Sequence, residues 1–565
     1  MRATPIKPAA HWTTPPGLIT CSLHSPGSFD PGLLTGNPSG VQRLAMKLLL
    51  PFLLALTACS PSKPRADLVF VQSAEPETID PALVTDQVSM RIEQSLFEGL
   101  CRVNAQGRPE PGCAERWDMS EDKKHYTFHL REAARWSDGT PVTANDFVQS
   151  WHRALEPETG AEYASQLYLI KNAKEYNEGT LKDFNQVGVH AIDDRTLSVD
   201  LQNPTPYFID MAAFDTLAPV PLGLIVKHGS RWIRPGNLLG NGPYLLDEWR
   251  LDDHIRLKKN PLYWDAANVK MATVEVLPIT DANTALNYFM TGEADLMMDK
   301  GMVPPSLTTT LKKQDWFHTG PFLGTWFIRI NVTKPPFTDP RVRRALALAV
   351  DKKLIVDKIT QLGEQPAQSL TPPGAGSNYQ PPPGLEFNPQ AARELLAQAG
   401  FPGGKGFPRI EYLYLPLGVE KNIAIELQAM WKQHLGIEVG LTKQEQKIWL
   451  ASLRELRYDM CRSSWVGDYN DPNTFLEMFT TGNGNNRTGW ESKEYDQGIA
   501  AAAAEADVSK RLGIFQGLEK QLISDAAPII PVYFYVGVQF YHGDKLAGAQ
   551  ANLIDNHPFR CMSWR

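Results

Sequence analysis

The chain has 565 residues, of which 42% are apolar and 21% are charged, and its net charge is -7 at pH 7. This is the composition of an ordinary soluble globular protein, and the mildly negative charge argues against a nucleic-acid binder. Roughly 500 residues follow the export signal described next. One hydrophobic core does not usually stabilise so long a chain, so two or three lobes are expected.

An export signal is predicted at residues 46–58. Lys47 precedes an apolar run of about a dozen residues, which is too short to span a bilayer but suits the centre of a secretory signal. Small residues directly before Cys59 resemble a bacterial lipobox. This predicts cleavage before Cys59, lipid on its sulfur and a polar tether over residues 59–66. The alternative is an ordinary signal with an incidental cysteine.

Residues 1–45 are rich in Pro, Gly, Ser and Thr and show no apolar periodicity. They would place the signal deep within the chain, where export signals do not normally lie. We therefore expect that translation begins at Met46 and that the upstream stretch is a mis-assigned leader.

The remaining chain predicts alternating strands and helices. Residues 67–73, 124–131, 195–201 and 269–277 have the pattern of strands, two of them with clear period-two alternation. No internal repeat interrupts this order. The fold class is therefore mixed α/β.

Helices are predicted where a capping residue precedes an apolar stripe. Thr143 caps a helix over 143–153, and Asp339 followed by Pro340 opens another. A third helix is expected over 391–399, after two Pro-Gly breaks.

Four cysteines follow the lipobox. Cys101 and Cys113 flank a turn-rich segment at 107–112, so a disulfide between them is one expectation in an oxidising compartment, and two free thiols are the other. Cys461 and Cys561 are expected to be buried thiols.

No pattern typical of a catalytic site occurs. The chain lacks His-Glu-x-x-His, Gly-x-Ser-x-Gly and Cys-x-x-Cys, and its 12 histidines have no metal-ligand spacing. The glycine-rich segment at 403–406 lacks the Ser or Thr of a phosphate loop and is expected to be a surface turn. The sequence therefore favours binding over catalysis, without metal or cofactor.

Seven motifs are spread along the chain, at residues 79–81, 95–100, 136–144, 241–244, 259–264, 331–339 and 465–472. In this order they resemble solute-binding protein family 5, the oligopeptide-binding proteins of bacterial ABC importers. The resemblance implies a periplasmic-binding-protein-like clamshell of two α/β lobes with an additional inserted N-terminal domain. The implied ranges are 67–88, 205–324 and 536–565 for lobe I, 89–204 for inserted domain II, and 325–535 for lobe III.

The resemblance also implies the function. Such a protein captures a peptide, closes on it and delivers it to an ABC permease that is driven by cytoplasmic ATPases. The protein is expected in the periplasm or on the outer face of the membrane, held to the membrane by the lipid anchor only. It is expected to be a monomer.

The implied ligand contacts begin with Asp468, which matches the family carboxylate that pairs with the α-ammonium of the peptide. The backbones of Val466 and Gly467 match one side of a strand-like peptide sandwich. The segment that contains Glu75 and Glu77 matches the other side. The alternative for Asp468 is a turn-capping role.

Further matches concern the side-chain pockets. Trp465 and Tyr163 match pocket-lining aromatics, with core packing as the alternative. Arg462 matches a basic residue near the carboxylate end of the peptide, and its alternative is a structural salt bridge. Asn486 is expected to add a polar contact or to cap a loop.

One departure from the family pattern affects the expected cargo. Glu420 stands where the enteric members often have a histidine that faces the carboxylate of longer peptides, and an acidic side chain would repel it. We expect a narrower ligand range, with short peptides or a cell-wall peptide favoured. The alternatives are a nickel chelate or oligosaccharide as cargo, a ligand sensor, or an exported hydrolase built on this scaffold.

Overall fold

The computed structural model describes residues 64–376, 379–416 and 418–565. The expected leader, the signal peptide and Cys59 lie outside these residues. Residues 66–565 form one unit by their contacts and are described here by themselves. Among the helices of the described residues, none has both the length and the apolar character that crossing a membrane requires.

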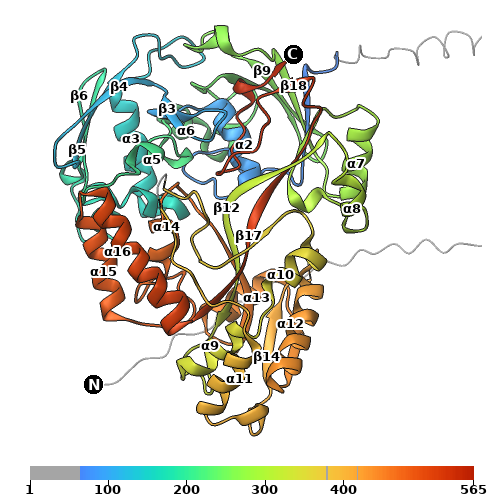
Figure 1. The fold of residues 1–565 in the computed structure, drawn as a ribbon. Helices are drawn as coiled ribbons and strands as arrows, with labels where there is room; N and C mark the ends of the chain where they lie inside the picture. Colours follow the sequence, from blue (N-terminus) through green and yellow to red (C-terminus); the bar gives the residue numbers. More distant parts are fainter. Residues whose placement is uncertain (1–63, 377–378, 417) are drawn as a thin grey trace, which may run out of the picture. The chain divides into compact units, whose positions relative to one another are not determined.

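A mixed sheet of 11 strands runs through this unit (Figure 1). Its strand order is β15-β14-β16-β12-β17-β11-β1-β10-β9-β8, and β13 pairs with β17 beside this path. The strands are β1 (Leu68–Gln72), β8 (Tyr244–Arg250), β9 (His254–Lys259), β10 (Thr273–Pro278), β11 (Leu296–Met298), β12 (Phe317–Ile330), β13 (Gln365–Pro366), β14 (Ile410–Tyr414), β15 (Val439–Lys443), β16 (Met460–Val466) and β17 (Ile529–Phe540).

The long antiparallel pair β12 and β17 joins a first lobe, which contains β1 and β8 to β11, to a second lobe, which contains β14 to β16. At one end β17 pairs with β11, and at the other β12 pairs with β16. The hydrophobic core changes along β17: Val536 packs with Val69 and Phe317, whereas Tyr533 packs with Trp326. The protein is therefore a two-lobed α/β clamshell, as the sequence predicts.

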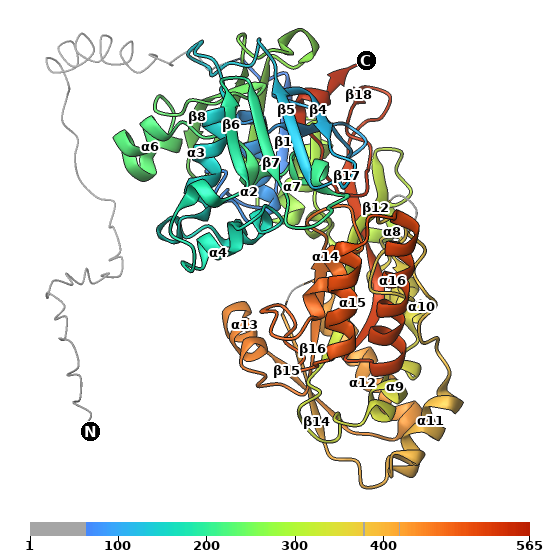
Figure 2. The same ribbon diagram turned by 90° about the vertical axis from the view of Figure 1, so that its left-hand side faces the viewer.

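A separate antiparallel sheet lies within residues 89–204. Its strand order is β4-β5-β7-β6, and Figure 2 shows it beside α3. Phe147 and Trp151 of this region share one hydrophobic core with Phe70 of β1, so it packs directly onto the first lobe. The bounds are β4 (Ala114–Met119), β5 (His125–Leu130), β6 (Val189–Asp193), β7 (Thr196–Asp200) and α3 (Ala144–Leu155).

The remaining helices and short strands flank these sheets. Longer helices are α2 (Gln87–Leu96), α6 (Leu222–His228), α7 (Ala282–Met290), α9 (Pro340–Leu348), α11 (Pro389–Gln398), α12 (Glu420–Leu435), α13 (Gln446–Arg454), α15 (Lys493–Ala504) and α16 (Val508–Lys520). Shorter elements are α4 (Ala173–Asn177), α5 (Phe208–Met211), α8 (Thr308–Leu311), α10 (Lys352–Ile355), α14 (Asn473–Leu476), β2 (Cys101–Val103), β3 (Pro109–Pro111), β18 (Leu546–Ala547) and β19 (Ser563–Trp564).

Local signals predicted these elements well. Strands β1, β5 and β7 and helices α3, α9 and α11 are confirmed. Thr143 caps α3 through a capping box with Asp146, and Asp339 caps α9. Helix α11 begins two residues before the predicted start, because Asn388 caps it and Pro389 suits its first turn. Strand β10 starts later than predicted, because Val269 still closes a turn onto Ala266.

The disulfide considered between Cys101 and Cys113 is not formed, and both side chains are buried free thiols. The register of β2 and β3 places Cys101 opposite Pro111 rather than Cys113. The Cys113 sulfur instead accepts a hydrogen bond from Asn241 Nδ2 at 3.2 Å. Cys461 is a buried thiol as predicted, whereas Cys561 is only partly buried.

Candidate functional site

Two cavities meet at the segment that follows β16. One has a volume of about 950 Å³ and extends between residues 162–207 and the second lobe, and the other has about 430 Å³ and borders the first lobe. Residues that line both are Thr85, Tyr163, Trp465, Asp468 and Tyr469. Of the residues predicted from sequence, Tyr163, Trp465 and Asp468 are therefore brought together, and Val466 and Gly467 line the smaller cavity.

Asp468 is held by the turn that ends β16. Its own N–H donates to Thr474 Oγ1 at 3.1 Å, and Gly467 N–H donates to Leu323 O at 2.8 Å. A Cβ at Gly467 would lie 2.7 Å from a Leu323 methyl carbon, so only glycine allows this approach. The carboxylate is thereby directed between the lobes, where the Tyr163 hydroxyl donates to Oδ1 at a long 3.4 Å.

The surroundings of Asp468 make its charge costly. Burial raises the pKa of this carboxyl to about 6, and hydrogen bonds from Tyr163 and Gln166 oppose the rise only in part. Within the described residues no cation forms an ion pair with it. A cationic group of a ligand would therefore find an unneutralised carboxylate in a protected place.

Polar atoms of the binding segment also lack partners. The indole N–H of Trp465 is buried and makes no hydrogen bond within the described structure, although the ring borders both cavities. Val466 is 43% exposed, which is unusual for a valine at the end of a central strand. The unpaired indole N–H and the exposed valine both leave the end of β16 available for contact with another molecule.

An aromatic contact missed by the sequence reasoning joins the two sides of the larger cavity. The rings of Tyr207 and Tyr469 stack with centroids 4.1 Å apart and planes 9° from parallel. Asn473 Nδ2 donates to the hydroxyl of Tyr469 at 3.0 Å and to Glu477 Oε2 at 2.7 Å. Burial raises the pKa of Glu477 to about 7. No local pattern marks Tyr207, because its partner is more than 250 positions away in the sequence.

Arg462 and Glu420, both expected near the carboxylate end of a ligand, pair with each other. Arg462 donates to Glu420 Oε1 at 2.9 Å, and the Trp326 indole donates to the same oxygen at 3.0 Å. The two side chains are 13% and 12% exposed. Neither residue is among those that line the two cavities. The positive charge of Arg462 is therefore neutralised within the protein.

The other sequence-predicted residues lie outside the two cavity linings. Glu75 accepts a hydrogen bond from the Trp249 indole at 2.5 Å, and Glu77 is exposed, with its N–H donating to Ser89 Oγ at 3.2 Å. The Asn486 side chain bonds to four groups of its own loop, which is the loop-capping alternative. Its neighbour Asn485 lines the larger cavity instead.

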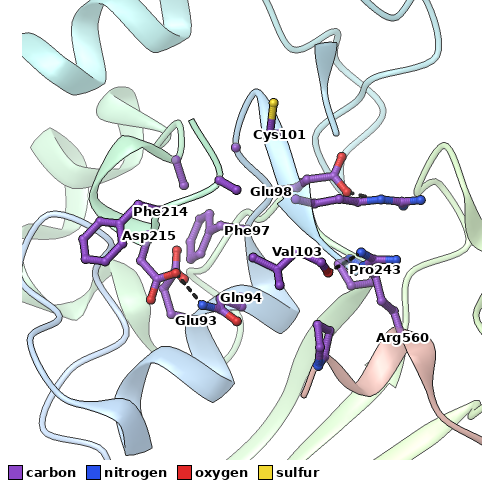
Figure 3. Close-up of a pocket in the computed structure, with 15 residues that line it drawn as sticks. Glu93, Gln94, Phe97, Glu98, Cys101, Val103, Phe214, Asp215, Pro243 and Arg560 are labelled. Carbon is purple, nitrogen blue, oxygen red and sulfur yellow. Dashed lines mark hydrogen bonds and ion pairs between the residues drawn. The ribbon is translucent and has the colours of Figure 1, made fainter. Parts of the chain in front are cut away.

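A third cavity lies behind α2 and is too small for a ligand. Figure 3 shows it bordered by Glu93, Gln94, Glu98 and Asp215, and its volume is about 30 Å³. This space suits one or two water molecules. Gln94 donates to Asp215 at 2.7 Å, and burial raises the pKa of Asp215 to about 7. The cavity is therefore a buried polar pocket beside α2 rather than a second binding site.

Known proteins resemble the chain over most of its length. It is 38% identical to the periplasmic oligopeptide-binding protein OppA of Escherichia coli K12 over 481 residues, which are 84% of this chain and 88% of OppA. The structure matches the murein tripeptide binding protein MppA of Escherichia coli with a TM-score of 0.76 and 34% identity, covering 88% of this chain and 98% of MppA. A periplasmic oligopeptide-binding protein of Borrelia burgdorferi matches with a TM-score of 0.77 and 31% identity, covering 88% of this chain and 99% of that protein.

The family assignment rests on a continuous part of the sequence. Residues 108–487 match the family described as bacterial extracellular solute-binding proteins, family 5 Middle. This region includes the second sheet, most of both lobes and the segment that carries Asp468. The chain belongs to family 5 of the bacterial extracellular solute-binding proteins.

Proposed function

We propose that the protein binds peptides outside the cytoplasm for uptake by an ABC importer, without catalysing a reaction. The observation that carries this proposal is Asp468: an unpaired carboxylate directed between two lobes, at the junction of two cavities. The exposed backbone of Val466 and Gly467 beside it suits main-chain pairing with an extended ligand, which gives affinity without reading side chains. The names of OppA and MppA support a peptide as cargo.

The direct test is to identify the cargo. The protein is purified under native conditions and unfolded, and the released small molecules are analysed by mass spectrometry. We expect peptides with free amino termini. Recovery of only non-peptidic molecules, together with no calorimetric binding of di- to pentapeptides, would refute the proposed function.

Binding should depend on pH through Asp468. The pKa of its carboxyl is about 6 in the free protein, and an ammonium partner favours the ionised form, so the pKa falls on binding. Affinity is therefore highest near pH 7, decreases by about tenfold per pH unit below pH 6, and decreases again above about pH 8, where the peptide ammonium loses its proton. Calorimetry of a tripeptide between pH 5 and 8 measures this, and proton release should be about half a proton per bound peptide near pH 6 and approach one proton at lower pH. A flat profile would show that Asp468 does not meet the ammonium.

The mechanism that we propose is closure of the lobes on the peptide. We assign residues 67–88, 205–324 and 536–565 to lobe I, 89–204 to domain II and 325–535 to lobe III. The change of hydrophobic core along β17 between Tyr535 and Val536 supports one of these boundaries. Since β12 and β17 are continuous through both lobes, twisting of this pair offers a hinge.

We also propose a lipid anchor at Cys59 and delivery to a permease by a monomer at the cell envelope. The support for the anchor is the sequence of the signal segment alone. Expression of residues 46–565 in a bacterial host should place the protein in the membrane fraction, and Cys59→Ser should move it to the soluble envelope fraction. An unchanged distribution of the variant would contradict lipidation at this residue.

A second candidate within the family is a cell-wall peptide as cargo. The likeness to MppA favours it, and so does the Glu420–Arg462 pair, because a neutralised arginine offers no anchor for an ordinary peptide carboxylate. Competition of a murein tripeptide against alanine tripeptides distinguishes the two cargoes. A nickel chelate or an oligosaccharide would leave Asp468 without an ammonium partner, whereas a sensor role would be favoured by a gene that has no permease genes beside it.

A further inference from the structure

Lys300 offers a positive charge on the first lobe, close to where the chain crosses to the second. It follows β11, and the adjacent Asp299 fixes its position by accepting hydrogen bonds from Ser73 Oγ and Gly301 N–H, both at 2.7 Å. Ser73 comes directly after β1 and opens the segment that we expect to border the ligand. Lys300 is therefore attached to the first-lobe side of the cleft.

The ammonium of Lys300 has no carboxylate partner. Its Nζ lies 3.3 Å from the centroid of the Tyr535 ring, a cation–π contact, and within the described residues it forms no ion pair. The side chain is half-buried. A cation–π contact at a partly exposed site contributes only about 0.5–1 kcal/mol, so an incoming carboxylate can compete for the ammonium.

Tyr535 links this charge to the wall of the smaller cavity, although neither Lys300 nor Tyr535 itself lines the cavity. Its ring lies 6.2 Å from that of Phe322, which lines the cavity. It also packs against Gly324, where a Cβ would come within 2.7 Å of the tyrosine ring, and Gly324 is the strand partner of Val466. A series of contacts therefore connects Lys300 through Tyr535 and Gly324 to β16, which ends at Val466, two residues before Asp468.

The spacing of the two charges can be estimated from the sheet. Tyr535 lies two strands away from β16, near the level of Val466, and Asp468 lies two residues further along. Two strand spacings and two residue rises place the backbones of Tyr535 and Asp468 about 12 Å apart, and Lys300 Nζ lies over the ring of Tyr535. An extended chain advances about 3.3–3.6 Å per residue, so this distance corresponds to a ligand of about three or four residues.

Other cations of the region are already paired, among them Arg91, which lines the smaller cavity and lies 3.7 Å from Asp555. Arg462 is paired with Glu420, and its charge is balanced without a ligand. Among the residues that the structure describes, Lys300 is an ammonium near this part of the cleft that forms no ion pair, so it can meet a free carboxylate. Because Lys300 and Asp468 are on different lobes, a ligand that contacts both also holds the lobes together.

We propose that Lys300 anchors the carboxylate of the bound peptide and that its separation from Asp468 restricts the preferred ligands to about three or four residues. This inference rests on the proposed peptide-binding function. It assigns a specificity-determining role to a residue in a loop that the family motifs of the sequence do not include.

The test compares trialanine with trialanine amide by calorimetry on the wild type, Lys300→Met and Lys300→Arg. Lys313→Met, at an exposed lysine of the same lobe, is the matched control. A charge-assisted hydrogen bond predicts that Lys300→Met weakens trialanine by about 10- to 100-fold. The amide should change less than about twofold in affinity, and Lys300→Arg should retain most of the preference for the free acid.

The outcomes separate the two claims. If Lys300→Met weakens the acid and the amide equally, or neither, the carboxylate role is wrong while peptide binding stands. If the wild type binds neither ligand, nor hexaalanine, a dipeptide or a murein tripeptide, the proposed function itself fails. If Lys300→Met is poorly folded, as judged by its thermal transition, loss of the acid preference in Lys300→Gln decides the question in the same way.

Discussion

Asp468→Asn should weaken the binding of peptides with a free α-ammonium by roughly 30-fold to several thousand-fold, the equivalent of about 2–5 kcal/mol. At 4 Å and an effective dielectric near 20, the lost charge pair is worth about 4 kcal/mol before desolvation is subtracted. Asparagine preserves the shape and can still accept from Tyr163, so the fold should be intact. Calorimetry with an unmodified tripeptide measures the effect.

The same peptide with an acetylated amino group provides the essential comparison. It lacks the ammonium, so it should bind weakly to the wild type and change little in Asp468→Asn. Asp544→Asn, at an exposed aspartate before β18, is the control variant and should bind like the wild type. Equal losses for the free and the acetylated peptide would assign Asp468 to the structure of its turn rather than to ligand recognition.

Arg511→Met should lower the free energy of unfolding by about 3–5 kcal/mol, because it leaves a buried aspartate uncompensated. The Arg511 guanidinium pairs with both oxygens of Asp471 at 2.7 and 2.8 Å, and the side chains are only 3% and 7% exposed. Asp471 lies three residues after Asp468, so this pair also fixes the binding segment against α16. The urea midpoint of unfolding measures the loss.

An exposed pair of the same chemistry is the control. Arg341 pairs with Asp339 at 2.6 Å, but these side chains are 47% and 27% exposed, so Arg341→Met should cost less than about 1 kcal/mol. Adding Asp471→Asn to Arg511→Met should recover part of the loss, since no unpaired charge then remains buried. Similar small shifts for both arginine variants would show that burial does not govern this interaction.

The sequence predicted local structure wherever the signal is contained within a few residues. Thr143 and Asp339 were recognisable as helix caps because the groups they bond lie two or three residues ahead. Period-two alternation identified β5 and β7 for the same reason. The disulfide considered between Cys101 and Cys113 was not predicted correctly, because its formation depends on a strand register that the spacing of the cysteines does not determine.

The candidate site was predicted in part. The motif at 465–472 lies at the junction of the two cavities, and Tyr163 meets it there although 305 positions separate it from Asp468. The sequence did not indicate the stacking of Tyr207 on Tyr469, the pairing of Arg462 with Glu420 or the contact of Lys300 with Tyr535. Each of these contacts joins residues that lie far apart in the sequence, and the residues around one partner give no sign of the other.

By itself, the sequence determined the family, the α/β class and the turn that carries Asp468. These features depend on motifs and on helix or strand periodicity, which consecutive residues show without a folded structure. Tertiary structure alone decided which charges are free to meet a ligand. Arg462 is neutralised by Glu420 and Lys300 has no such partner because of how distant segments pack. The strength of an ion pair depends on distance and burial rather than on residue type alone.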